Sequence, residues 1–157
     1  MTLQSVKREI AFTIMDVARL LKTYADQRAR QFGISRAQWA VLIRIERTQG
    51  LKQSELAELL DLQPISLTRL LDRLADNGLI ERRADPHDRR ANRLYLTAAA
   101  KPLLGRLSEL GADMMETVLD GLDEKSIERM LKQLGALKDN LRRAISANTQ
   151  PEVALNG

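Results

Sequence analysis

The stretch from Lys52 to Arg93 constrains the fold of this chain more than any other. It begins with two short amphipathic segments separated by Asp61 and Leu62. Pro64 stands where the second segment starts, a position that favours proline because its fixed φ suits a helix and its missing N–H is not needed there. Two short helices around such a tight turn predict a helix-turn-helix, whose second helix can enter a DNA major groove. The expected apolar faces consist of Leu56, Leu59 and Leu60 in the first helix and Leu67, Leu70, Leu71 and Leu74 in the second.

A short hairpin is expected after the second helix, which should end at Gly78. Residues 79–83 and 93–96 have the pattern of short strands. The loop Asp85–Asn92 between them starts with turn-forming residues and becomes rich in arginine toward its end. A basic loop beside a recognition helix is typical of a wing, and arginine suits a narrow, electronegative minor groove. The whole stretch therefore predicts a winged helix-turn-helix that contacts both grooves of DNA.

Residues 64–97 resemble the winged-helix core of the MarR family of bacterial transcription regulators, and its SlyA-like members in particular. The run Asp88-Arg89-Arg90 matches the wing signature of that family, and the resemblance extends more weakly over residues 5–147. Two positions depart from the family pattern. Asp61 stands where the family often has glycine in the turn, but aspartate tolerates the left-handed region better than most residues. Ala100 stands where glycine is common after the second wing strand, and Pro102 is expected to bend the start of the following helix.

The resemblance implies a mainly α fold with a small β-hairpin wing, in which N- and C-terminal dimerisation helices accompany a winged helix-turn-helix domain. The chain would form a single MarR-like domain with several parts. These are dimerisation helices at 5–31 and 123–147, the winged helix-turn-helix at 35–97, a connecting helix at 98–121 and a flexible tail at 148–157.

Apolar residues outside the winged segment favour association of two chains. A first helix over residues 6–30 carries an apolar stripe longer than one small domain can cover. The last helix, with Asp123 as its cap, repeats apolar residues at near-heptad spacing, which favours helix pairing. A two-fold dimer is the economical solution, and a monomer with an antiparallel helix pair folded onto the domain is the alternative.

Two further helices are expected to frame the core. Ser35 and Gln38 form the pattern of a capping box in front of a helix over residues 36–48. This helix is apolar almost all round, so Trp39 is expected to belong to the core. Thr97 is placed to cap the helix that follows the wing.

Composition restricts the chemistry that this chain can perform. The 157 residues include no cysteine and one histidine, His87, so disulfides, thiol sensors, histidine triads and multi-histidine metal sites lack the residues they need. A glycine-rich phosphate loop is also missing. We therefore expect no enzyme, no cofactor and no metal. The net charge of +4 permits nucleic-acid binding. Without a signal peptide or a long apolar run, the chain is expected to be cytoplasmic and to have no membrane partner.

Two classes of function fit these features. The first is a ligand-responsive homodimeric regulator, most simply a repressor, that binds a pseudo-palindromic operator in double-stranded DNA. The alternative is a winged-helix architectural or protein-interaction module without an effector. The regulator is favoured because an interaction module needs no paired groove-reading elements.

The expected DNA contacts come from the recognition helix and the wing. Arg69 should reach base edges in the major groove, and Arg73 should meet phosphate. The resemblance assigns minor-groove contact to Arg90. Arg89 should contact the DNA backbone, and Asp88 should orient the wing by pairing with a nearby arginine. The complete set is Gln63, Pro64, Ser66, Thr68, Arg69, Arg73, Asp88, Arg89 and Arg90.

The resemblance also implies a small-molecule effector, often an aromatic carboxylate or a phenol, bound between the dimer helices and the winged domain. Tyr24, Trp39 and Met115 are expected to line this pocket, and Arg19 or Arg28 to meet a carboxylate.

Overall fold

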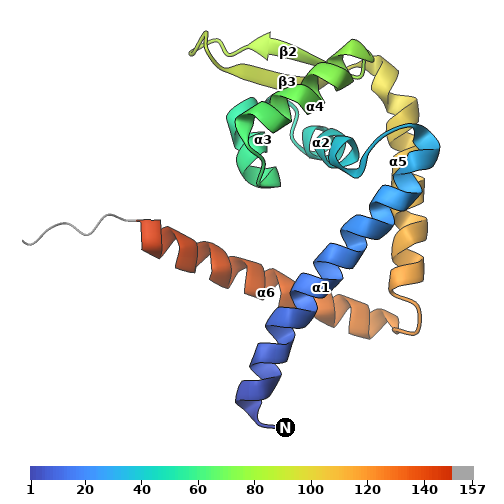
Figure 1. The fold of residues 1–157 in the computed structure, drawn as a ribbon, viewed down its shortest axis with the longest axis vertical. Coiled ribbons are helices and arrows are strands. Elements are labelled where there is room, and N and C mark those ends of the chain that lie inside the picture. The colour runs from blue at the N-terminus through green and yellow to red at the C-terminus, as the bar shows by residue number, and fades with distance from the viewer. Residues whose placement is uncertain (150–157) are drawn as a thin grey trace, which may run out of the picture. The chain divides into compact units, whose positions relative to one another are not determined.

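The computed structural model describes residues 1–149 and divides the chain into two compact units, which meet between Met114 and Met115. The prediction of a mainly helical fold with a small β-hairpin is confirmed (Figure 1). Two 3-10 turns and three short strands accompany six α-helices within the described residues. The elements are α1 (Leu3–Ala29), η1 (Arg30–Phe32), α2 (Arg36–Arg47), β1 (Leu51–Lys52), α3 (Gln53–Leu60), α4 (Pro64–Asp76), β2 (Ile80–Ala84), β3 (Asn92–Leu96), η2 (Ala98–Ala100), α5 (Lys101–Val118) and α6 (Glu124–Thr149).

Local hydrogen bonds explain where several helices begin and end. Gly33, with φ of 69°, closes the turn after α1. The Ser35 hydroxyl accepts from the N–H of Gln38 at 3.1 Å, and the Gln38 side chain accepts in return from the N–H of Ser35 at 3.0 Å. The predicted capping box is therefore confirmed, and so is the end of α4 at Gly78, whose φ is 71°.

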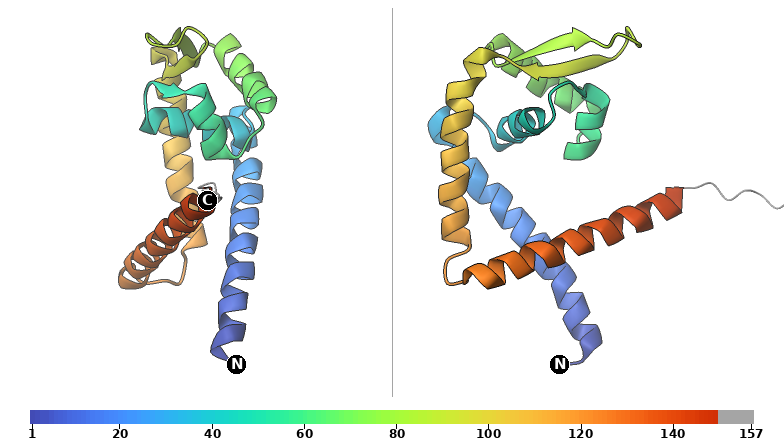
Figure 2. Two further views of the ribbon diagram at one scale, coloured as in Figure 1. Left: turned by 90° about the vertical axis from the view of Figure 1, so that its left-hand side faces the viewer. Right: turned by 180° about the vertical axis from the view of Figure 1, so that it is seen from behind.

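The sheet has three antiparallel strands in the order β1-β3-β2. Ile80 pairs with Leu96 and Ala84 with Asn92, so the two wing strands extend over residues 80–84 and 92–96, one residue away from their predicted bounds. Strand β1 was not predicted, because only Leu51 and Lys52 pair with β3. The loop of the hairpin stands clear of the helices of its unit in Figure 1 and in the right-hand view of Figure 2.

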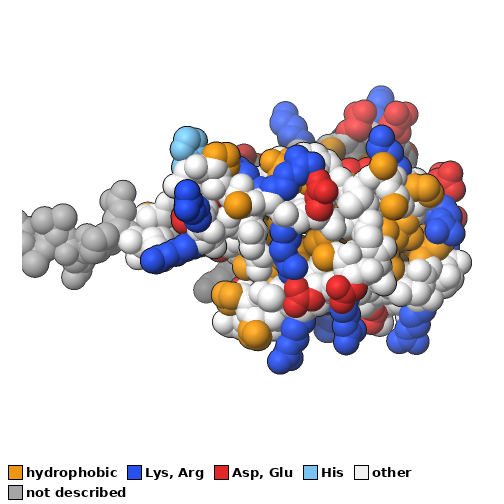
Figure 3. All heavy atoms as spheres, turned by 90° about the horizontal axis from the view of Figure 1, so that it is seen from above, with side chains coloured by type: hydrophobic (Ala, Val, Ile, Leu, Met, Phe, Trp, Pro, Cys, Tyr) orange, Lys and Arg blue, Asp and Glu red, His pale blue; other side chains and the backbone are white. Residues whose placement is uncertain are grey.

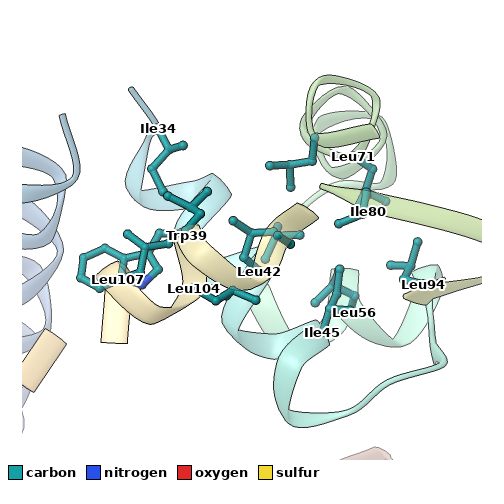
Figure 4. Close-up of a cluster of buried hydrophobic side chains, with 14 of the residues drawn as sticks. Ile34, Trp39, Leu42, Ile45, Leu56, Leu71, Ile80, Leu94, Leu104 and Leu107 are labelled. Carbon is teal, nitrogen blue, oxygen red and sulfur yellow. The ribbon is translucent and has the colours of Figure 1, made fainter. Parts of the chain in front are cut away.

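The core of the first unit lies among its short helices and one face of the sheet. Figure 4 shows side chains from α2, α3, α4, α5 and both wing strands turned toward one another. Trp39 is 7% exposed, so its expected place in the core is confirmed. The expected apolar face of α3 was partly wrong, since Leu59 is 51% exposed whereas Ala57 is buried. The reason is rotational, because Leu56, Ala57 and Leu60 lie on one side of the helix and Leu59 does not share it.

Helix α5 begins differently from the prediction. Thr97 lies in front of it, but the Thr97 hydroxyl donates to the carbonyl of Gly78 and does not accept from a helix N–H. Thr97 is thus the N-cap residue, as predicted, but its side chain makes no capping bond, because a carbonyl at the open end of α4 competes for this hydroxyl. A single 3-10 turn that contains the buried Ala100 precedes the α-helical part, consistent with a disturbed start near Pro102.

The second unit consists of the end of α5 and helix α6. Asp123 accepts from the N–H of Ser126 at 2.8 Å, which confirms it as the cap of α6. The predicted tail begins at 148, but Asn148 and Thr149 still belong to α6, and residues 150–157 lie outside the described part of the chain. The apolar stripe of α6 is exposed and includes Met130, Leu131, Leu134, Leu137, Leu141 and Ile145.

Helix α1 also presents apolar side chains that its own unit leaves uncovered. Its stripe continues the spacing of three and four residues seen in the sequence, and the exposed members are Val6, Ile10, Ile14 and Val17. Within residues 1–149, every helix is either too short or too polar to cross a membrane.

Candidate nucleic-acid interface

One residue in the left-handed region makes the turn between α3 and α4. Asp61 has φ of 52° and ψ of 46°, and it is the one non-glycine residue with positive φ among residues 1–149. The N–H groups of Asp61 and Leu62 donate to carbonyls of α3 at 3.2 and 2.9 Å, which closes that helix. Gln63 is extended and α4 starts at Pro64, as predicted. Aspartate thus adopts the left-handed conformation that glycine often adopts in such a turn, because its short polar side chain lowers the energetic cost of this conformation.

Helix α4 divides cleanly into a buried and an exposed face. Leu67, Leu71 and Leu74 are fully buried against the core. The opposite face carries Arg69 and Arg73, one helical turn apart and both exposed. Gln63, Pro64, Ile65 and Ser66, at the start of the helix, are exposed as well. A face with free donors near the helix N-terminus fits the requirements of a recognition helix.

Thr68 differs from its neighbours, because its hydroxyl is already engaged. It donates to the carbonyl of Pro64 at 2.9 Å and accepts from the side-chain amide of Gln53 at 3.0 Å. Gln53, which the sequence analysis did not single out, thereby joins the first helix of the motif to the second. This contact indicates a structural role for Thr68 beside its predicted role at DNA.

A buried carboxylate organises the wing. Asp85 is 3% exposed, and its two oxygens accept from the N–H of His87 at 2.8 Å and from Nε of Arg93 at 2.7 Å. Arg93 also donates from Nη1 to the carbonyl of Gly50 at 2.9 Å. The hydrogen bond from His87 in the first place, and the nearby Arg93, hold the pKa of Asp85 below its ordinary value although burial opposes this shift.

The role expected for Asp88 in pairing with an arginine was wrong. Its Oδ1 accepts from the backbone N–H of Arg90 at 3.0 Å, and its carbonyl accepts from the N–H of Ala91 at 3.0 Å. Among the ion pairs of residues 1–149, none involves Asp88. An N–H two residues ahead is within easy reach of an aspartate in a turn, so Asp88 shapes the backbone that presents Arg90. The aspartate that pairs with an arginine is Asp85.

Three of the seven arginines between residues 63 and 93 are held by contacts inside the protein. Besides Arg93, Arg82 donates to Asp72 of α4 at 2.6 Å, which ties strand β2 to the recognition helix. Arg83 pairs with Glu81, and its guanidinium lies 4.0 Å from the centre of the Tyr95 ring. Arg82 and Arg93 fix the wing to the helix-turn-helix, whereas the contacts of Arg83 stay within the wing. The sequence analysis did not assign these roles.

The other four arginines have no side-chain partner among the described residues. They are exposed, and they occupy only the recognition helix and the wing loop. An arginine without a protein partner can bind a phosphate or a base edge at no loss of internal contacts. Seen from the side that bears the hairpin and α4, Lys and Arg side chains are spread over the face, its hairpin end included (Figure 3). The four residues are Arg69, Arg73, Arg89 and Arg90.

A hollow joins the two predicted DNA-contacting elements. It has a volume of about 650 Å³ and lies between α3, the turn, the start of α4 and the wing. Gln63 and Pro64 line it from the helix side, and Asp88 and Arg90 line it from the wing. Four of the predicted site residues therefore meet at one depression of the surface.

Two of the residues proposed for an effector pocket, Tyr24 and Arg28, lie in contact with each other. Arg28 donates to the Tyr24 hydroxyl at 2.9 Å and to Asp113 at 2.7 Å, so these two candidates touch, but Arg28 is committed to a carboxylate. Arg19 is exposed, and its Nη2 lies 3.5 Å from Oδ1 of Asp16. Their assignment to a ligand stays a prediction.

Trp39 lines a separate, open and mainly apolar surface hollow of about 290 Å³ between α1 and α2. Its Nε1 is the one buried side-chain nitrogen or oxygen without a hydrogen-bond partner among the described residues. Met115 belongs to the second unit and is 41% exposed. No group of His, Asp or Glu side chains in the described part of the chain could hold a metal ion.

The comparisons with known proteins agree with this geometry. The model of the MarR family matches residues 34–91. The crystal structure of the transcriptional regulator PA3341 is 30% identical, with a TM-score of 0.76 over 85% of this chain and 98% of that chain. S. aureus MepR, solved in complex with DNA, is 26% identical, with a TM-score of 0.71 over 84% of this chain and 97% of that chain. A MarR transcriptional regulator from Methanosarcina mazei Go1 is 23% identical and shares the fold, with a TM-score of 0.80 over 87% of this chain and 99% of that chain.

The family model covers the segment in which the turn, the recognition helix and most of the wing lie. The regulator of 30% identity is spanned almost end to end. The chain therefore belongs to the MarR family of DNA-binding winged-helix transcriptional regulators.

Proposed function

We propose that this protein is a cytoplasmic homodimeric repressor that binds a pseudo-palindromic operator in double-stranded DNA and is released by a small aromatic ligand. The DNA-binding part rests on one observation, the four partnerless arginines of the recognition helix and the wing. This role requires no catalytic chemistry and no cofactor. The DNA complex of MepR, a structural neighbour, supports a DNA partner.

The four partnerless arginines have different expected DNA contacts, because two lie on the recognition helix and two on the wing loop. Arg69 lies about one turn after the start of α4. From there its guanidinium can bind O6 and N7 of a guanine in the major groove. Arg73, one turn further, would contact phosphate. Arg90 would enter the minor groove from the wing, and Arg89 would contact the backbone beside it. Gln63 and Ser66 lie near the helix N-terminus, which favours contact with phosphate.

The dimeric part of the proposal rests on uncovered apolar surface. In this scheme, residues 5–31 and 123–147 form the dimer contact, the winged helix-turn-helix occupies 35–97, and residues 98–121 connect them. Several leucine and isoleucine side chains of α1 and α6 are between 40 and 64% exposed, which is costly for a chain that stays alone. Pairing of two copies would remove these side chains from water and set two recognition helices about one helical turn of DNA apart.

The effector part is supported by the hollow beside Trp39. Its volume of about 290 Å³ suits a single aromatic ring, and its mainly apolar lining suits the faces of such a ring. Lys22 and Arg36 also line the hollow and could attract a carboxylate. Since Arg28 is held by Asp113, these two cations suit the effector better than Arg28 does.

A binding titration with two variants tests the DNA-binding proposal. The operator is first isolated from genomic fragments, and binding is then measured with an excess of unrelated DNA. Arg69→Ala should cost about 1–3 kcal/mol and flatten the preference at one base position in each half-site. Arg90→Ala should weaken binding most where the flanks are A·T-rich.

The same titration separates the two classes of function. Wild-type binding that disappears under competition by unrelated DNA would favour the architectural module. Equal losses by both variants on every sequence would mean that both arginines contact only phosphate.

A further inference from the structure

Arg93 connects three segments that are distant in the sequence. It belongs to strand β3, its Nε reaches Asp85 at the start of the wing loop, and its Nη1 reaches the carbonyl of Gly50. Both partners accept from the one guanidinium, at 2.7 and 2.9 Å. The side chain of Arg93 is about one third exposed, at 34%, whereas that of Asp85 is 2% exposed. This contact is therefore formed largely within the protein, unlike an ordinary surface ion pair.

The carbonyl that Arg93 holds lies at the entrance to the helix-turn-helix. Gly50 precedes strand β1, and α3 starts directly after that strand at Gln53. The N–H of Gly50 donates to the carbonyl of Leu94 at 2.9 Å, so this loop is tied to β3 from both sides. Gly50 has φ of 80°, and a Cβ there would lie 3.0 Å from the Tyr95 hydroxyl. The loop at Gly50 packs closely against strand β3 of the wing, so a displacement of the loop would displace the wing as well.

The other partner of Arg93 leads to the tip of the wing. The N–H of Asp85 donates to the carbonyl of Ala91 at 2.9 Å, and Ala91 is next to Arg90. Asp85 also accepts from the N–H of His87, which shapes the first half of the loop. Arg93 thus links the loop before α3, through one carboxylate, to the backbone that carries Arg90.

We propose that Arg93 is a positioning residue that holds the wing, and with it Arg90, in a set orientation relative to the helix-turn-helix. The inference rests on the proposed binding of an operator through both grooves. Loss of the guanidinium would release the wing loop at Asp85 from the carbonyl of Gly50, whereas the backbone pairing of β3 with Gly50 and β1 would remain. Helix α4 would stay in place, because it packs through its buried leucines. Major-groove contact would persist and minor-groove contact would weaken.

The test is a double-mutant cycle on an operator with A·T-rich flanks. Arg93→Ala should lower affinity by about tenfold, the size of effect expected for one lost arginine contact. In the background of Arg90→Ala it should cause almost no further loss, because the contact it positions is already missing. In the background of Arg69→Ala the two losses should multiply. Equal further losses in both backgrounds would overturn the proposal, since Arg93 would then act on its own.

Arg83→Ala is the matched control. Arg83 faces Arg93 in the register of the sheet and has the same charge, but it pairs with Glu81 and touches neither Asp85 nor Gly50. Its replacement should reduce affinity independently of Arg90. Dependence on Arg90 equal to that of Arg93→Ala would reduce the effect to the loss of a positive charge and overturn the proposal.

A second variant covers the case in which Arg93→Ala fails to fold. Arg93→Lys keeps the charge, but one ammonium cannot reproduce the fixed fork that reaches Asp85 and Gly50 together. It should reproduce the selective loss with an unchanged melting temperature, and wild-type affinity for this variant would contradict the inference. If the wild-type protein binds the operator specifically and only the cycle fails, the proposed function stands and the positioning role falls. If the wild type shows no specific binding, both fall.

Discussion

At Arg82 and Arg93 the guanidinium is bound by carboxylates of the same unit, whereas at Arg69 and Arg90 it has no partner among the described residues. All four belong to one basic stretch, and the sequence offered no means of telling the two pairs apart. Proximity in space is decisive here, because Arg82 and Arg93 each meet an aspartate at least eight residues away in the sequence. The arginines that remain free are the ones from which a regulator can make DNA contacts without losing internal ones.

Ile65 carries a prediction of its own at this scale. It is 62% exposed on the recognition helix, one turn before Arg69. An aliphatic side chain there can contact the C5-methyl group of a thymine. Replacing that thymine with uracil should cost the wild type about 0.8 kcal/mol, the value of one buried methyl-sized group, and should cost Ile65→Ala almost nothing.

The measurement is a titration of both proteins against operators with single uracil substitutions. A uracil effect of the same size in both proteins would assign the methyl contact to another residue. Leu59→Ala is a suitable control, because Leu59 is also exposed but belongs to α3 and lies outside the recognition helix.

At the scale of elements, the turn of the helix-turn-helix rests on the backbone of Asp61. Its φ of 52° lies in the left-handed region, which is unfavourable for most residues that carry a Cβ. Asp61→Ala should lower the free energy of unfolding by about 1 kcal/mol, whereas Asp61→Gly should leave it equal or higher. Denaturant unfolding of both variants checks this, and a stable alanine variant would show that the left-handed conformation is not strained here.

The stability of the wing is expected to depend on pH through Asp85. Its pKa is lowered in the folded protein, first by the N–H of His87 and then by Arg93, so folding favours the charged carboxylate. This stabilisation is present above the ordinary pKa of about 3.9 and is lost as the pH falls through the lower folded value. Asp85→Asn should therefore be less stable than the wild type at neutral pH, and the difference should shrink at acidic pH. Unfolding curves at both ends of this range test it, and a constant difference would contradict it.

For the whole molecule, exposed apolar stripes on α1 and α6 make association the expected state. Replacing Leu134 and Leu141 with glutamate should dissociate the dimer, because charges would stand where apolar side chains are expected to pack. Sedimentation at micromolar concentration measures this. Leu59→Glu is the matched control, since it places the same charge on an exposed leucine outside both stripes and should leave the dimer intact. A wild-type protein that sediments as a monomer would contradict the dimer.

Short-range features were determined by the sequence alone. The capping box of Ser35 and Gln38, the left-handed Asp61 and the end of α4 at Gly78 all depend on hydrogen bonds or backbone preferences within a few residues. The division of α4 into a buried and an exposed face followed from its periodicity. These local rules, together with the family resemblance, were sufficient for the fold class and for the recognition helix.

Tertiary structure alone decided the contacts between distant segments. Strand β1 consists of only two residues that pair with β3. A two-residue strand shows no alternation of apolar and polar side chains from which it could be predicted. The Thr97 hydroxyl donates to the carbonyl of Gly78 and makes no bond to its own helix. Arg93 pairs with Asp85 and not with Asp88. In each case several partners of similar chemistry were available along the chain. The choice among them depended on which groups the packed core brought within about 3 Å of each other, a distance that no sequence spacing encodes.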